Sequence, residues 1–203
     1  RDIRALPKLE GTVHVNVALI VKFIANYFFK PAKFAEISKQ SDPNNDDFLF
    51  NQGTTRGLGN ISFHDYRIAY NSVNLPNVNV FKKQIRKLKL LLLLAKPNKA
   101  QRRDIDFLLT LGEIFTLVVY GQLILENAKI YNIDDDIVDQ IFDCLIRDFS
   151  RFALQLYSKS STTSLQRRIS SMMIEKPVAR KDRFSRVWET YVYALKNQYV
   201  MNE

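Results

Sequence analysis

Few residues of this chain have the types and spacing that catalytic or metal-binding chemistry needs. The two histidines, His14 and His64, lie far apart in the sequence, and no cysteine lies near either of them. A metal site usually gathers more ligands than this, so we expect two ordinary hydrogen-bonded histidines and predict no metal site. The single cysteine, Cys144, excludes an internal disulfide framework and fits a reducing compartment.

Nucleotide and hydrolase motifs are also missing from the sequence. It contains no Walker phosphate loop, no dinucleotide-binding fingerprint and no nucleophile elbow. It lacks the paired Glu-x-x-His elements of di-iron helical bundles. The glycine-rich stretch 52–59 (QGTTRGLG) has no lysine where a phosphate loop requires one, so we interpret it as a flexible loop.

The opening segment, residues 1–16 (RDIRALPKLEGTVHVN), combines a carboxylate with a threonine directly before an apolar stretch. On side-chain chemistry alone this pattern is typical of the start of a helix. Thr12 can cap the first turn, and the carboxylate of Glu10 would lie near the positive end of the helix dipole.

In order and spacing, the same segment resembles the end of the catalytic domain of flavin-dependent acyl-CoA dehydrogenases. That family has a short R-D-x-[KR] stretch, an apolar approach, then Glu-Gly-Thr and a helix. The matching residues here are Arg1 and Asp2, followed by the run Glu10, Gly11 and Thr12. The match covers about sixteen residues, and its combined pattern is more specific than Glu-Gly-Thr alone.

The resemblance implies roles for three residues. Glu10 corresponds to the general base that removes the α-proton of an acyl-CoA thioester, Gly11 lets the backbone approach the ligand, and Thr12 lies near the flavin. FAD is therefore the implied cofactor, bound by a site that lies mostly outside this chain. Where relatives often carry glutamine-type residues, this sequence has His14 and Asn16, so flavin or dimer contacts at these positions are expected to differ.

Apolar periodicity in the remaining sequence predicts an all-α fold, a helical bundle preceded by a long irregular loop. A buried helix is expected over 13–30, ended by Pro31, and a basic amphipathic helix over 80–96. A central helix is expected over 105–125, where Gly112 and Gly121 predict close helix crossings. The clearest apolar stripe follows Asp134 to Asp136 and comprises Val138, Ile141, Phe142, Leu145, Phe149, Phe152 and Leu156, with Asp139, Asp143, Arg147 and Arg151 on the opposite face.

The resemblance also divides the chain. Residues 1–30 correspond to the end of the catalytic helical domain of an acyl-CoA dehydrogenase, 31–79 to a long loop or linker, and 80–203 to a helical C-terminal extension. It implies that this chain works as part of a larger enzyme and is inactive alone. The implied partners are the acyl-CoA substrate, the remainder of the dehydrogenase and further copies in a homo-oligomer.

The net charge of +9 leaves other partners open, because a basic surface attracts nucleic acids, anionic membranes and phosphorylated small molecules. The alternative to the dehydrogenase is a freestanding basic helical module that binds nucleic acid or an acidic protein. For a dehydrogenase, nucleic acid is not an expected partner, whereas the helix over 80–96 leaves peripheral membrane contact open. The longest uninterrupted apolar run, 90–95, is too short to span a bilayer, so we expect a soluble, cytoplasmic chain.

Overall fold

The computed structural model describes residues 12–32, 61–196 and 198. This part of the chain is mostly helical, which confirms the predicted all-α class. Its short strands β1 (Pro31–Ala32) and β2 (Phe63–His64) pair in parallel. The helices are α2 (Val13–Ile20), η2 (Val21–Phe23), α3 (Ile24–Phe29), α5 (Tyr66–Asn71), α6 (Pro76–Leu94), η4 (Gln101–Arg103), α7 (Ile105–Tyr131), α8 (Asp135–Ser158), α9 (Ser164–Met172), α10 (Lys181–Val187), the π-helix η5 (Trp188–Val192) and η6 (Tyr193–Leu195).

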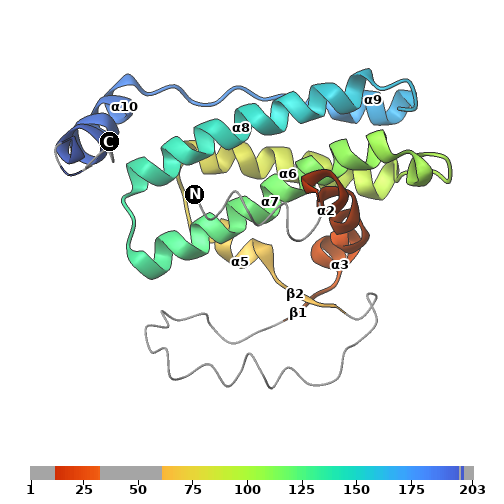
Figure 1. Cartoon of the computed structure of the whole chain (residues 1–203), viewed down its shortest axis with the longest axis horizontal. Helices are drawn as coiled ribbons and strands as arrows, with labels where there is room; N and C mark the ends of the chain where they lie inside the picture. Colours follow the sequence, from red (N-terminus) through yellow and green to blue (C-terminus); the bar gives the residue numbers. More distant parts are fainter. Residues whose placement is uncertain (1–11, 33–60, 197, 199–203) are drawn as a thin grey trace.

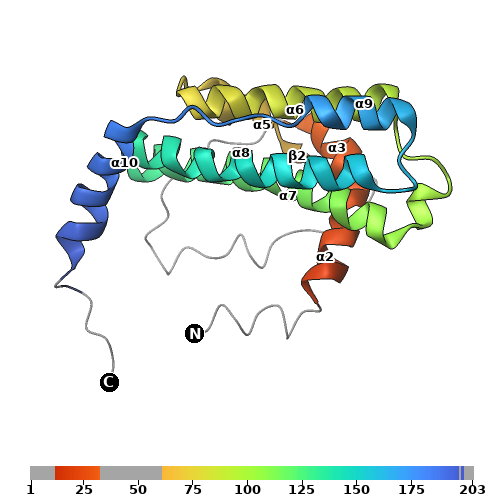
Figure 2. The same cartoon turned by 90° about the horizontal axis from the view of Figure 1, so that it is seen from above.

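Three long helices, α6, α7 and α8, form the body of the bundle (Figures 1 and 2). Helix α8 packs against both α6 and α7, and α9 lies along α6 and α8. Helix α2 crosses α7, and α5 covers another part of it. Helix α10 packs on α8, at the opposite end of the bundle from α9 (Figure 1). Helix α7 is therefore the central helix, as its apolar sequence predicts.

Aromatic side chains fill the space between these helices. The ring of Phe81 on α6 lies edge-on to Phe142 and Phe149 on α8, with centroid separations of 5.3 and 5.5 Å. Tyr70 on α5 stacks on the same Phe81 ring and donates a hydrogen bond to the carbonyl of Val118 on α7. One apolar cluster thus joins α5, α6, α7 and α8, and such edge-on ring pairs stabilise a core beyond simple burial.

The helix boundaries follow their capping residues. Asp104 caps α7 by accepting from the N–H of Phe107, and Asp134 caps α8 by accepting from that of Asp136. The predicted start of the second of these helices is confirmed. Asn132 ends α7 in the left-handed conformation that asparagine tolerates. Thr163 caps α9, where it forms a reciprocal capping box with Gln166.

The segment 31–79 is less irregular than its composition indicates. Its described part contains β1, β2 and α5, and α6 begins at Pro76 rather than at residue 80. Proline is favoured at the first position of a helix because its missing N–H would have no partner there. The expected flexible loop 52–59 lies outside the described residues.

Both glycines of α7 lie at close crossings, as predicted. A Cβ built on Gly112 would collide with the carbonyl oxygen of Val17 on α2 and lie 2.8 Å from its Cγ1. A Cβ on Gly121 would collide with the hydroxyl of Tyr70 and lie 3.3 Å from the ring of Phe81. At an exposed helix position alanine would be more stabilising than glycine. The two glycines therefore mark the places where α2 and α5 approach α7 closely.

Replacing Gly112 with alanine should destabilise the chain although alanine is the better helix former. The added methyl meets the backbone of Val17, which cannot rotate away, and overpacking of this kind costs about 1 to 3 kcal/mol. Urea denaturation would measure the change, with Asn127→Ala on an exposed face of the same helix as the control. An increase in stability on Gly112→Ala would contradict the close crossing.

The predicted exposure of Asp139 and Asp143 is wrong, because both carboxylates are buried on α8. The chain after α9 runs back along the bundle and brings α10 onto this face (Figure 1). There the guanidinium of Arg183, which is 2% exposed, pairs with both carboxylates. Arg147 and Arg151 are exposed as expected. Acidic residues on one face of a helix indicate that this face is exposed to solvent only when no cation from elsewhere in the chain packs over them.

The contact between α10 and α8 should also weaken in acid. Hydrogen bonds from Arg186 hold the pKa of Asp136 below its usual value of about 3.9. A lowered folded-state pKa stabilises the contact above pH ~4, and this contribution is lost as the pH falls through the folded value. Trp188 on η5, the only tryptophan, reports on this end of the bundle. Its fluorescence should change as the pH falls below about 4, and Asp136→Asn should remove that component. An identical profile in the variant would contradict the assignment.

Helix α7 is long and apolar enough to cross a membrane by length and composition. The search for an uninterrupted apolar run did not identify this helix, because polar residues interrupt the apolar sequence of α7. Within its most apolar window, 50% of the residues are buried inside the protein. Helices α2, α5 and α8 pack against α7 and cover part of this apolar surface.

Candidate functional site

The start of α2 carries the one described residue of the predicted Glu-Gly-Thr site. Thr12 is the N-cap of α2, and its hydroxyl accepts a 3.4 Å hydrogen bond from the N–H of Val15. This confirms the capping role that its side-chain chemistry suggests. Glu10 and Gly11 lie outside the described residues. They directly precede a helix end that carries unpaired N–H groups and a partial positive charge.

Helix α2 offers two different faces. Its inner face is anchored on α7 at the crossing of Val17 over Gly112. On its outer side Val13 and Val15 are half exposed, and Leu19 is 44% exposed. The helix that follows Thr12 is thus held firmly by the bundle while it presents apolar side chains to its surroundings. His14 on the same helix is exposed, and among the described residues it belongs to no group of three or more possible metal ligands.

A chain of polar side chains links the paired strands to the core. The hydroxyl of buried Tyr27 donates to Gln122 over 2.6 Å, and the amide of Gln122 donates to Glu126 over 2.7 Å. The ring of His64 on β2 contacts the same Glu126 carboxylate over 3.2 Å, which confirms that His64 is a hydrogen-bonded histidine. Burial raises the pKa of Tyr27 far above its ordinary value, so its hydroxyl stays protonated and donates. The chain fastens β2 and α3 to α7.

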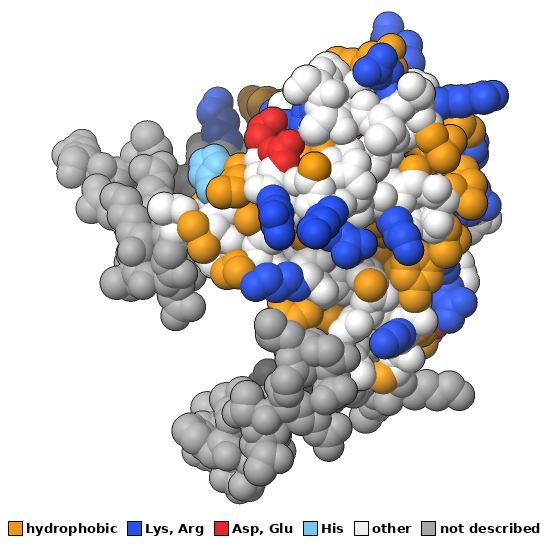
Figure 3. Space-filling view, turned by 90° about the vertical axis from the view of Figure 1, so that its right-hand side faces the viewer, with side chains coloured by type: hydrophobic (Ala, Val, Ile, Leu, Met, Phe, Trp, Pro, Cys, Tyr) orange, Lys and Arg blue, Asp and Glu red, His pale blue; other side chains and the backbone are white. Residues whose placement is uncertain are grey.

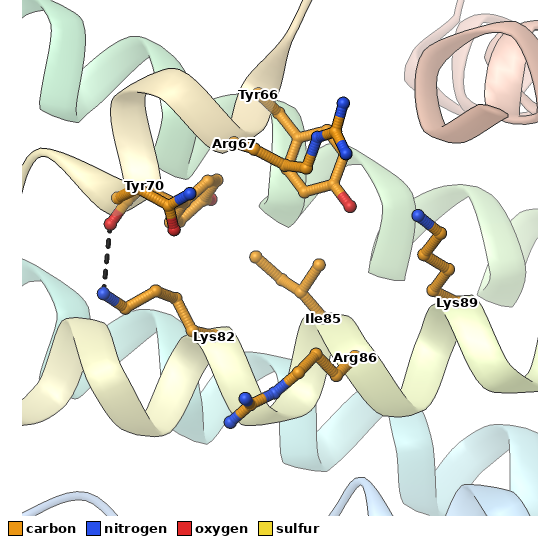
Figure 4. Close-up of a pocket in the computed structure, with 8 residues that line it drawn as sticks. Tyr66, Arg67, Tyr70, Lys82, Ile85, Arg86 and Lys89 are labelled. Carbon is orange, nitrogen blue, oxygen red and sulfur yellow. Dashed lines mark hydrogen bonds between the residues drawn. The ribbon is translucent and has the colours of Figure 1, made fainter. Parts of the chain in front are cut away.

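A groove of about 290 Å³ lies between α5 and α6 (Figure 4). Apolar surface from Tyr66, Tyr70 and Ile85 forms its floor, and Asn71 lies at one end of α5. Its walls carry four cations, Arg67 from α5 and Lys82, Arg86 and Lys89 from α6. The α6 residues recur at spacings of three and four, which brings them onto one face of the helix. We call this feature the basic groove.

Hydrogen bonds fix two of the four cations. Lys82 Nζ donates to the carbonyls of Tyr70 and Val73, over 3.1 and 3.0 Å, and thereby ties the end of α5 to α6. Burial and then the positive charge of Arg86 lower the pKa of Lys82. Arg67 forms a forked pair with Asp65, whose pKa it holds below the usual range. Within the described residues no carboxylate pairs with Arg86 or Lys89.

A second basic surface lies at the end of the bundle where α6 passes into α7 and α8 into α9. Figure 3 views the molecule from this side and shows several Lys and Arg side chains over it. Its carboxylates are already engaged, since Asp104 caps α7 and accepts from Ser161, and Asp106 pairs with Lys159. We call this surface the basic end; its exposed cations are Lys96, Lys99, Arg102, Arg103, Arg167 and Arg168.

Sequence reasoning found the start of α2 and the basic character of α6, and it missed the groove. The sequence signal for the groove was the set Lys82, Arg86 and Lys89 at helical spacing. The opposite wall belongs to α5, a helix that the sequence analysis did not predict. In the described parts of the chain, His, Cys, Asp and Glu side chains gather nowhere as a metal site would require.

Comparison with known proteins yields no match: none is found among protein-family models, curated proteins or solved structures.

Proposed function

We propose that this chain is the C-terminal portion of an FAD-dependent acyl-CoA dehydrogenase and supplies the catalytic base, Glu10, to the complete enzyme. The observation that carries the proposal is the order of Arg1, Asp2, Glu10, Gly11 and Thr12 directly before a helix. Residues 1–30 would then complete the catalytic helical domain, and residues 80–203 would form its C-terminal extension.

The packing of α2 supports this proposal. Thr12 caps the helix, and the crossing of Val17 over Gly112 holds it against the center of the bundle. A reacting carboxylate needs a rigid support, because a small misplacement of a catalytic group costs much of the rate. The exposed Val13 and Val15 give the remainder of the dehydrogenase an apolar surface to cover.

In the proposed reaction the carboxylate of Glu10 takes the α-proton of the acyl-CoA thioester. A bound FAD would supply the acceptor for the β-hydrogen, which would leave as hydride, so that a double bond would join the two carbons. Because the α-carbon is a weak acid, the site must stabilise negative charge on the thioester oxygen, which the backbone N–H of Glu10 would help to do. The exposed hydroxyl of Thr12 fits a residue beside a bound flavin; the rest of the FAD site would come from the remainder of the enzyme.

The proposal extends to location and assembly. The complete enzyme would be a cytoplasmic homo-oligomer. Its helical extension would contribute an oligomer or partner surface, with peripheral membrane contact through α6 as an open alternative.

Spectroscopy of two purified samples tests the proposal. The complete protein that contains this chain should be yellow and should lose its flavin absorbance when an acyl-CoA is added. The 203-residue chain alone should be colourless and should reduce no flavin-linked dye with any acyl-CoA. A complete protein without flavin, or turnover by the chain alone, would contradict the assignment.

A second candidate function is a basic helical module that binds nucleic acid, and the basic end is the observation that favours it. Its six exposed cations lie where the nearby carboxylates Asp104 and Asp106 already have partners. An extended polyanion would meet several of these cations at once, and its condensed counterions would be released on binding.

Salt separates this candidate from the dehydrogenase. If the chain is a nucleic-acid module, its affinity for a labelled DNA duplex falls steeply as salt rises. Replacing Lys99 and Arg102 with glutamine should reduce both the affinity and its salt dependence, while replacing Lys83 and Lys87 on α6 with glutamine should have little effect. Absence of binding at low salt removes this candidate.

A further inference from the structure

We infer that the basic groove between α5 and α6 is a binding site for the phosphate or pyrophosphate group of a small organic phosphate. The inference does not rest on the dehydrogenase assignment, because none of the groove residues belongs to the opening segment that carries Glu10.

The groove is a built feature whose width is fixed. The two hydrogen bonds from Lys82 to carbonyls of Tyr70 and Val73 clamp the end of α5 to α6. Tyr70 is itself held by its bond to the carbonyl of Val118. The floor residue Ile85 is 3% exposed, so it belongs to the core and cannot move away.

The charges of the groove are unbalanced. Asp65 neutralises Arg67, and the ammonium group of Lys82 lies between backbone carbonyls. Lys89 Nζ lies 5.4 Å from the ring center of Phe29 on α3, a contact that holds it in place without removing its charge. Arg86 lies at the exposed rim, and its positive charge adds to the effect of burial in lowering the pKa of Lys82. Such a site favours an anion that several donors can share.

The geometry favours phosphate over a simple carboxylate. A guanidinium can pair with either anion, but a phosphate group carries more negative charge and more acceptor oxygens than a carboxylate, so it can be shared by a guanidinium and an ammonium at once. The hydroxyl of Tyr66 points into the space between Ile85 and Lys89 and offers a further donor (Figure 4). The apolar floor beside these donors would accept the organic part of the ligand, which inorganic ions lack.

The size of the groove limits its occupant. Its volume of about 290 Å³ lies at the lower end of the range for ligand pockets, about 300 to 1,000 Å³. One or two phosphate groups and a small organic part therefore fit, with the rest of a larger ligand extending into solvent.

Calorimetry with the 203-residue chain and inorganic pyrophosphate at low salt tests the site. The chain should bind with a dissociation constant of about 1 mM or tighter. Arg86→Gln combined with Lys89→Gln should weaken binding by at least about tenfold, because charge-assisted hydrogen bonds are lost. Lys83→Gln combined with Lys87→Gln removes the same number of charges from positions of α6 that do not line the groove, and it should change the affinity less than about twofold.

Two further probes identify the source of the phosphate. Tighter binding of ADP than of pyrophosphate would assign a soluble nucleotide-like ligand. Retention on vesicles that contain a phosphoinositide, with ADP binding no tighter than pyrophosphate, would assign a lipid headgroup.

Either of two results would overturn the site. One is the absence of pyrophosphate binding at low salt. The other is an equal loss of affinity in the groove variant and in the Lys83→Gln/Lys87→Gln control, which would show diffuse charge instead of a groove. Arg86 and Lys89 are at least partly exposed, so the groove variant should keep the melting temperature of the parent chain. If that temperature changes, binding should be measured with Arg86→Gln alone.

Discussion

Arg183→Met should lower the free energy of unfolding by about 3 to 5 kcal/mol, the usual cost of removing one partner from a buried ion pair. Its guanidinium is 2% exposed and pairs with Asp139 and Asp143 on α8. Without it, two carboxylates would stay buried with too few partners. Asp139 would keep the N–H of Asn77, 2.7 Å away, and Asp143 would keep Arg147. Urea denaturation, followed by far-UV circular dichroism and by Trp188 fluorescence, measures the loss.

Two companion variants show whether the effect comes from the buried charges. Arg186→Met removes a half-exposed arginine from the same helix and should cost much less, because solvent screens its ion pairs. Arg183→Met combined with Asp139→Asn and Asp143→Asn removes the unpaired charges and should recover part of the loss. If Arg183→Met behaves like Arg186→Met, the buried network does not hold α10 on the bundle.

The central helices could be predicted from their sequence because local pattern and global packing agree there. Helix α8 has an apolar stripe at helical spacing and an acidic first turn, and both features act within one helix. The two glycines of α7 also indicated their close crossings, since glycine weakens a helix and is expected there mainly where another element packs closely.

Features that depend on distant segments could not be predicted in this way. Asp139 and Asp143 look like solvent-facing residues until Arg183, some 40 positions later, folds across them. The basic groove likewise needs α5, a helix of six residues that is too short to give a periodic signal. Its stability comes instead from Tyr70 packing into the core.

The candidate catalytic segment was predicted from a resemblance in residue order, and its chemistry does not follow from periodicity. Thr12 caps α2 for local reasons, and it would do so whether or not the segment is catalytic. The assignment of Glu10 as a base therefore needs a test that a helix cap would not affect.

Glu10→Gln in the complete protein is that test, and it should have the largest effect of all. Glutamine keeps the size and polarity of the side chain but cannot take a proton, and general-base catalysis contributes about 10²- to 10⁴-fold to a rate. Bound flavin, folding and acyl-CoA affinity should be preserved. Lys22→Gln, at an exposed position beyond α2, serves as the control and should react like the parent.

The measurement is stopped-flow absorbance of the flavin after mixing with an acyl-CoA. In the Glu10→Gln protein the substrate-driven loss of absorbance should be slowed by about 10² or more, while Lys22→Gln bleaches at the parent rate. Bleaching of the Glu10→Gln protein at the parent rate would contradict the account.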